Sequence, residues 1–246
     1  MLDGSLLVHS PVEWTSELGV ALSRLGGEVS HIISPNYEHL KYAKQWSEIY
    51  PGAFMYACPG LPAIKPEISW AYELGHSAPE SLSSNGIECV YFDCEINPFT
   101  GRPFFNEVVF YHAKSKSFMM ADVFWNYPSG EFPNYSDHKD SDNETGTQHI
   151  CSKAPTPLLP GGRLPSVPVP KGTMLWKLGM DKVYWPFYQR FMVGGRNDRT
   201  EKYKGAVRKI LSWDIEVIVP CHGDVIKGKE LCRRILTEHF ANALQS

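Results

Sequence analysis

Short apolar runs alternate with helix-like patterns along most of the chain. Buried strands are predicted where β-branched and aromatic residues cluster, at residues 5–10, 29–34, 53–58, 87–92, 107–112, 118–124 and 215–220. Helices are predicted where apolar residues recur every three or four positions, at residues 15–25, within 35–49, in part of 173–191, and at 200–213 and 230–244. Strands that alternate with helices favour an α/β protein over an all-β one.

One segment breaks this pattern. Residues 136–144 are all polar or charged, and prolines are frequent between residues 155 and 170. A segment of this composition cannot bury enough apolar surface to order itself. We therefore expect residues 128–171 to be a flexible insert within a single domain that spans residues 1–246.

The first predicted strand starts almost at Met1. The pair Asp3-Gly4, which precedes this strand, is typical of a tight hairpin turn between two strands. We therefore expect that N-terminal strands of the fold are missing from this sequence.

Composition narrows the class of partner. The formal net charge is −3, so the chain lacks the basic character of proteins that bind nucleic acid or an anionic membrane surface. It also lacks the run of about 18 apolar residues that a membrane-spanning helix needs. These features leave a small molecule as the expected partner.

Cysteine usage indicates a reducing compartment. No two cysteines form a Cys-x-x-Cys pair, and the chain starts without the basic and apolar regions of a secretory signal. We expect free thiols and an intracellular location, cytoplasmic by default or within an organelle. The six cysteines are Cys58, Cys89, Cys94, Cys151, Cys221 and Cys232.

Polar residues follow several predicted strands, and in layered α/β folds ligands bind beyond such strand ends. The segment after residues 29–34 contains Asn36 and the adjacent pair Glu38-His39. One interpretation is a ligand site that combines a carboxylate with an imidazole. The alternative is a helix N-terminus, with Asn36 as the capping residue and Glu38 in the first turn.

Two later positions have the same character. Asp122 lies in a strongly apolar stretch, where an unpaired carboxylate is costly to bury, so it requires a metal, an arginine or several hydrogen-bond donors. His222 follows residues 217–219 and precedes Gly223, which permits a sharp turn. The alternatives are a carboxylate held by backbone N–H groups and an ordinary loop histidine. Glu107, before residues 108–110, is interpreted as a strand-edge charge.

Together these residues suggest a metal site. Glu38, His39, Asp122 and His222 offer two imidazoles and two carboxylates, which suit one Zn²⁺, Mn²⁺ or Fe²⁺ ion. Such an ion would lower the pKa of a bound water and supply hydroxide near neutral pH.

The order of these residues resembles the metallo-β-lactamase superfamily. That superfamily has a His-x-His-x-Asp-His motif after a strand, then a further His, a bridging Asp and a final His. The chain is more similar still to one branch of it, the DUF4336 family. The similarity is carried by residues 3–12, 35–39, 107–110, 121–122 and 222–223. The resemblance implies an αββα sandwich.

The resemblance also implies roles for individual residues. His39 matches the last His of the first motif and Glu38 its Asp, while Asp122 matches the bridging Asp and His222 the final His. Ser34 and Asn36 stand at the two leading His positions, and the middle His has no counterpart. The resemblance therefore implies at most one tightly bound ion, with Asn36 able to hydrogen-bond the substrate or a bound water.

Three functions compete. The first is a mononuclear metal-dependent hydrolase of unknown substrate, in which Asp122 orients water or acts as a base. The second is a non-catalytic binding or scaffold protein that keeps the fold of a metallo-hydrolase. The third is a metal-free enzyme that uses Cys221 beside His222, which has poor geometry because adjacent residues on a strand point to opposite faces.

Overall fold

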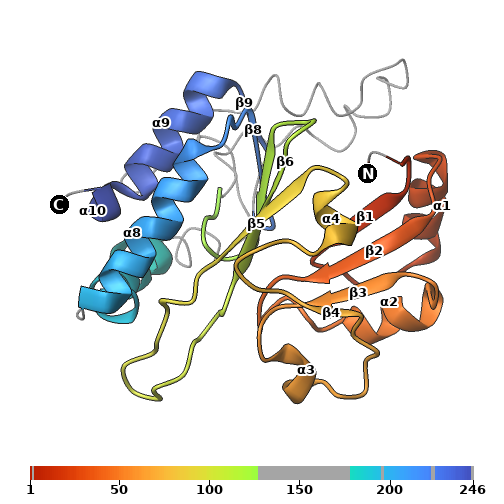
Figure 1. Cartoon of the computed structure of the whole chain (residues 1–246), viewed down its shortest axis with the longest axis horizontal. Helices are drawn as coiled ribbons and strands as arrows, with labels where there is room; N and C mark the ends of the chain where they lie inside the picture. The colour runs from red at the N-terminus through yellow and green to blue at the C-terminus, as the bar shows by residue number, and fades with distance from the viewer. Residues whose placement is uncertain (2, 127–177, 195–196, 223–224, 245–246) are drawn as a thin grey trace.

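The chain folds around two β-sheets (Figure 1). The computed structural model describes residues 1, 3–126, 178–194, 197–222 and 225–244. The insert expected at residues 128–171 lies outside these ranges, as does the first part of the helix predicted at 173–191.

The first sheet is parallel throughout. Its strands lie in the order β1 (Leu6–His9), β2 (Val29–Ser34), β3 (Phe54–Ala57) and β4 (Tyr72–Glu73). Parallel neighbours require crossover connections. The connecting helices are α1 (Ser16–Arg24), α2 (Ala43–Ile49) and α3 (Leu61–Ile64), and α4 (Glu80–Ser83) leads into the second sheet.

The second sheet is mixed. Its strands lie in the order β5 (Ile87–Tyr91), β6 (Val108–His112), β7 (Ser117–Met120), β8 (Val217–Pro220) and β9 (Ile226–Lys227). Only β7 and β8 pair in parallel among these described strands. The helical segments of this half are η1 (Met180–Tyr184), α7 (Trp185–Phe187), η2 (Tyr188–Met192), α8 (Asn197–Ser212), α9 (Lys229–His239) and α10 (Ala241–Leu244).

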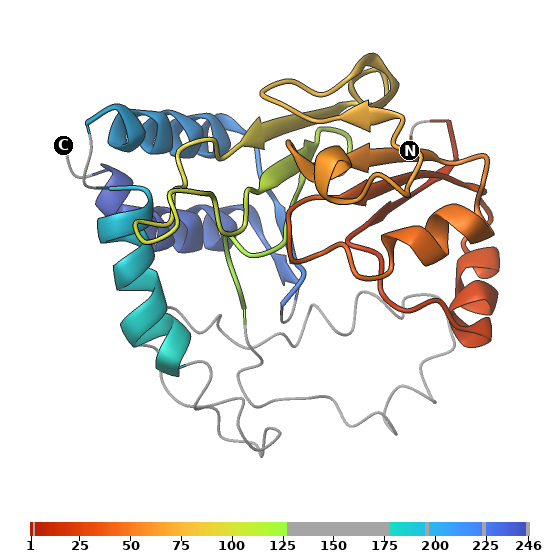
Figure 2. The same ribbon diagram turned by 90° about the horizontal axis from the view of Figure 1, so that it is seen from below.

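Alternating side chains divide the core into layers, because successive residues of a strand point to opposite faces. In β2, Ile33 packs between the two sheets and Ile32 packs toward α1 and α2. In β6, Phe110 faces the first sheet and Val109 faces the layer that contains α8 and α9. Figures 1 and 2 show these helices on the outer faces of the two sheets. The predicted αββα sandwich is thus confirmed.

Several predicted boundaries were wrong. Strand β7 ends at Met120 rather than at residue 124, so Asp122 lies in the turn beyond it, and α8 begins at Asn197 rather than at residue 200. Residues 180–192 are mainly π-helical around Pro186, which lacks the backbone N–H that a regular α-helical turn uses. The short elements α3, α4, β4 and β9 were missed because two to four residues carry no periodic pattern.

In the ranges that the structure describes, no helix combines the length and the apolar character needed to cross a membrane.

Candidate metal centre

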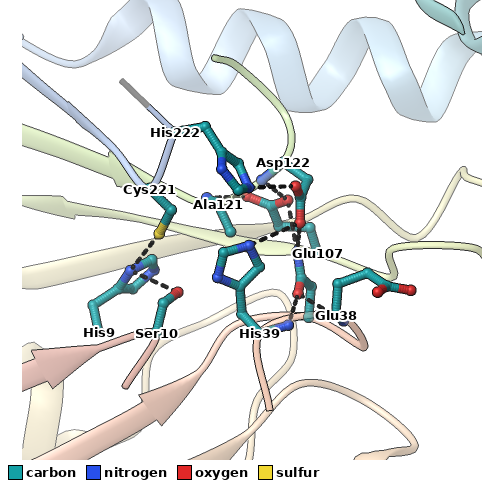
Figure 3. A network of polar contacts seen from close by, with 10 residues as sticks. His9, Ser10, Glu38, His39, Glu107, Ala121, Asp122, Cys221 and His222 are labelled. Carbon is teal, nitrogen blue, oxygen red and sulfur yellow. Dashed lines mark hydrogen bonds and ion pairs between the residues drawn. The ribbon is translucent and has the colours of Figure 1, made fainter. Parts of the chain in front are cut away.

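Three predicted ligand residues meet at one edge of the sandwich. Met120 of β7 pairs with Pro220 of β8 in parallel register, and Asp122 and His222 each follow two residues later. Parallel strands end at the same edge of a sheet, so these two side chains emerge next to each other. His39 approaches from the segment after β2 of the other sheet (Figure 3).

Asp122 lies between the two imidazoles. His222 Nε2 is 3.1 Å from Asp122 Oδ1, and His39 Nε2 is 3.2 Å from Asp122 Oδ2. One ligand atom from each residue can be chosen so that all three lie within 4.8 Å of one another. The Asp122 side chain is 13% exposed and that of His222 is 37% exposed, so solvent reaches the site from the His222 side.

The two neighbouring histidines favour the ionised form of Asp122. Burial by itself would raise the pKa of this carboxyl group. Hydrogen bonds with His222 and His39 outweigh that effect and hold the pKa well below its ordinary value. The centre of the site is therefore a carboxylate that is available to a cation.

Asn36 is fully buried, and its side-chain amide hydrogen-bonds to four protein groups. Its Nδ2 donates to Asp122 Oδ2 at 2.6 Å and to Glu107 Oε2 at 3.2 Å. Its Oδ1 accepts from the backbone N–H groups of Glu38 and His39, at 3.0 and 2.8 Å. Asn36 therefore caps the backbone N–H groups that follow it, as the alternative interpretation predicted. The capped segment is a turn, however, and not the start of α2.

Glu38 does not join the group. It is exposed, and Figure 3 shows its carboxylate pointing away from His39, Asp122 and His222. The turn capped by Asn36 fixes the backbone at both positions, so that the His39 side chain points inward and that of Glu38 outward. Of the four predicted ligand residues, the structure brings together His39, Asp122 and His222, and Glu38 lies apart from them.

Glu107 was wrongly interpreted as a strand-edge charge. It is fully buried, and Oε1 accepts from the N–H of Ala121 at 2.7 Å. Its Oε2 accepts from the N–H of Asp122 at 2.7 Å, in addition to the Asn36 amide. Burial, and after it the charge of Asp122, raises the pKa of Glu107. The signal in the sequence was its place in one of the family-like segments, residues 107–110.

Cys221 pairs with a different histidine from the one considered. Its Sγ lies 3.7 Å from Nδ1 of His9, at the end of β1 (Figure 3). Burial raises the pKa of the thiol to about 12 and lowers the pKa of His9 to about 3. Near neutral pH both groups are uncharged, so the geometry and the protonation states disfavour a Cys221–His222 nucleophile.

Further bonds hold the segment that carries Asp122. The backbone N–H of Asn126 donates to the carbonyl of His222 at 2.8 Å. His239 of α9 lies with Nε2 2.8 Å from the carbonyl of Val123 and stacks on Trp185 with ring centroids 4.1 Å apart. The turn beyond β7 is therefore attached both to the strand end that bears His222 and to the outer helical layer.

Solved structures of other proteins are similar in fold to this chain. The chemotaxis sensor ODP in a peroxy diiron state is 16% identical, with a TM-score of 0.54 over 96% of this chain and 82% of that one. The apo state of ODP from T. denticola is 18% identical, with a TM-score of 0.50 over 95% and 80%. The DIM-1 metallo-beta-lactamase is 14% identical, with a TM-score of 0.48 over 98% and 82%.

These are metallo-β-lactamase-fold proteins, and the likeness to ODP shows that this chain has that fold. No curated protein matches the chain by sequence. Residues 1–148, more than half of the 246, match the family described as a domain of unknown function, DUF4336. The chain therefore belongs to the DUF4336 family.

Proposed function

We propose that this protein is a metal-dependent hydrolase with a single-ion site held by His39, Asp122 and His222. The observation that carries the proposal is the convergence of two imidazoles and one carboxylate within 4.8 Å. The approach of both Nε2 atoms to the two oxygens of one ionised aspartate supports it further.

The chemistry of the donor set fits a divalent ion. Two neutral imidazoles with one carboxylate are ligands used for Zn²⁺, Mn²⁺ and Fe²⁺. An ion held there would act as a Lewis acid that polarises a carbonyl or phosphoryl oxygen and makes water a stronger nucleophile near neutral pH. The similar sensor ODP, whose structure is described as a diiron species, makes iron a natural choice to test beside zinc.

The residues of the chain would divide the remaining work. Asp122, ionised and between the imidazoles, would orient a water molecule. His222 is the more exposed ligand, so a small-molecule substrate would enter from its side. The amide of Asn36 already bonds four protein groups, so we assign its predicted catalytic role to the placement of Asp122 and His39.

Metal content is the first test. Protein purified without chelator or nickel affinity should carry about one Zn, Mn or Fe per chain. A His39→Ala/His222→Ala variant should lose that ion. A His76→Ala variant is the matched control, because His76 also lies beside a carboxylate, 3.5 Å from Asp93, and is not one of the three ligands.

The outcome decides between the hypotheses. Metal that is lost only from the double variant would support the site and justify an assay panel of esters, lactones, thioesters and phosphodiesters. Wild-type protein that stays metal-free after supplementation with all three ions would overturn the proposal.

A non-catalytic binding protein is the second candidate. It is favoured by the loss of imidazoles at the two positions where the superfamily motif has its leading histidines. Ser34 and Asn36 stand there, both fully buried, and Asn36 is engaged inside the protein. Stoichiometric metal binding without turnover of any substrate in the panel would support this function instead.

A further inference from the structure

We propose that Glu107 is a positioning residue that sets the metal affinity of the centre through Asp122 and Asn36, without itself touching the ion. This inference rests on the proposed metal site. It concerns a residue that the ligand set does not include.

The first link runs from Glu107 to the backbone of the central ligand. Each of its oxygens accepts a 2.7 Å hydrogen bond from one of two successive N–H groups, those of Ala121 and Asp122. This two-point attachment fixes the peptide from which the Asp122 side chain projects. Strand β7 ends at Met120, so the described strand pairing does not extend to that peptide. The bonds from Glu107 hold it instead.

The second link runs through Asn36 to His39. The Nδ2 of Asn36 faces the carboxylates of Glu107 and Asp122, and its Oδ1 faces two backbone N–H groups. If this amide were reversed, an oxygen would face the carboxylates and an NH₂ group would face the N–H donors. Glu107 thus helps to define the one amide orientation that caps the turn carrying His39.

Glu107 is placed to act indirectly. It has no exposed surface, and both of its oxygens are engaged by protein donors. All three of its donors are neutral N–H groups, so Glu107 acts on Asp122 and Asn36 through the direction of these hydrogen bonds. Its influence on the centre is therefore geometric, because it holds the Asp122 peptide and the Asn36 amide in the orientation that the structure shows.

The test uses Glu107→Gln, which keeps the shape of the side chain but replaces one of its two acceptor oxygens with an NH₂ group. Affinities for Zn²⁺ and Co²⁺ are measured on the whole chain by chelator competition, together with the visible spectrum of bound Co²⁺. Changes to groups that support metal ligands typically weaken binding about 10- to 100-fold. We expect a loss in that range and a changed Co²⁺ spectrum.

Glu95→Gln is the matched control. Glu95 is 2% exposed, and its carboxylate also accepts backbone N–H bonds, from Phe104 and Phe105 at 2.8 Å and from Asn106 at 3.3 Å. Loss of this carboxylate should lower stability without moving the metal affinity or the spectrum. If Glu107 had a purely structural role, Glu107→Gln would likewise lower stability and leave the metal affinity and the Co²⁺ spectrum unchanged.

Asn36→Ala supplies a second variant of the same network, which retains the Glu107 side chain. If both residues act through one network, the two losses of metal affinity should be smaller in combination than their sum. Unchanged affinity in folded Glu107→Gln, or in folded Asn36→Ala if the first variant does not fold, would overturn the inference. Wild-type protein that binds no metal would instead overturn the proposed function.

Discussion

Buried carboxylates near the site are held by neutral donors, and Glu95 is the one that lies outside the ligand network. Three backbone N–H bonds stabilise its charged form, but burial is the larger effect and raises its pKa above 4.5. Folded protein therefore binds more protons than unfolded protein between pH 4.5 and the raised pKa. Within that window Glu95 makes the free energy of unfolding fall as the pH rises.

Glu95→Gln should remove this part of the pH dependence. In wild-type protein the contribution of Glu95 lowers stability by up to about 1.4 kcal/mol per pH unit inside the window. The variant should be less stable at the acidic end, where it has lost one acceptor, and should show a flatter profile toward neutral pH. Urea unfolding at half-unit steps from pH 4.5 to 8 measures both effects, and parallel profiles would show that Glu95 has an ordinary pKa in the fold.

The elements differ in how directly they serve the centre. Strands β7 and β8 bring Asp122 and His222 to the same edge through their register, since Met120 is opposite Pro220. Helix α1 lies on the outer face of the first sheet and contains no buried residue. Its N-terminus is capped by Thr15, whose side chain accepts a hydrogen bond from the N–H of Leu18 at 3.2 Å.

Thr15→Ala should therefore affect stability and leave the centre unchanged. Loss of an N-cap of this kind costs about 0.5–2 kcal/mol. Thr15→Ser keeps the hydroxyl and should restore most of the loss. Thermal unfolding combined with Zn²⁺ titration measures the two properties, and a weaker Zn²⁺ affinity in Thr15→Ala would show that α1 is coupled to the site.

At the scale of the molecule, the centre is divided between the two sheets. His39 follows the first sheet, while Asp122 and His222 follow the second. The core between the sheets contains Phe110, which is fully buried and meets the ring of His9 edge to face, with centroids 5.7 Å apart. Packing in this layer sets the distance between the two groups of ligands.

Phe110→Ala should lower both stability and metal affinity. Truncation of a buried phenylalanine costs about 3–5 kcal/mol, and partial collapse of the cavity would move the sheets relative to each other. Phe240→Ala is the matched control, because Phe240 is also fully buried but packs in the layer between the second sheet and the helices. Denaturant unfolding should show comparable losses of stability in the two variants, whereas Zn²⁺ titration should show weaker binding only in Phe110→Ala. Equal Zn²⁺ affinities would contradict the idea that packing between the sheets sets the geometry of the centre.

The pattern of residues predicted an α/β protein, because periodicity records which face of each strand is buried, and the family resemblance implied the αββα sandwich. It also pointed to His39, Asp122 and His222, since a polar group just beyond an apolar strand stands out locally. Glu38 lies apart from these three residues, and Glu107 is fully buried rather than a strand-edge charge. In both cases the local sequence was compatible with a side chain that points into the protein and with one that points to solvent.

The amino-acid sequence by itself therefore determined the longer strands, the main helices and the three residues that converge, His39, Asp122 and His222. The tertiary structure decided which neighbours support them. Asn36 is 71 residues from Glu107 and 86 from Asp122 along the chain, yet one amide group bonds both. Contacts between residues so far apart leave no periodic trace in either segment, because they exist only once the two sheets have packed face to face.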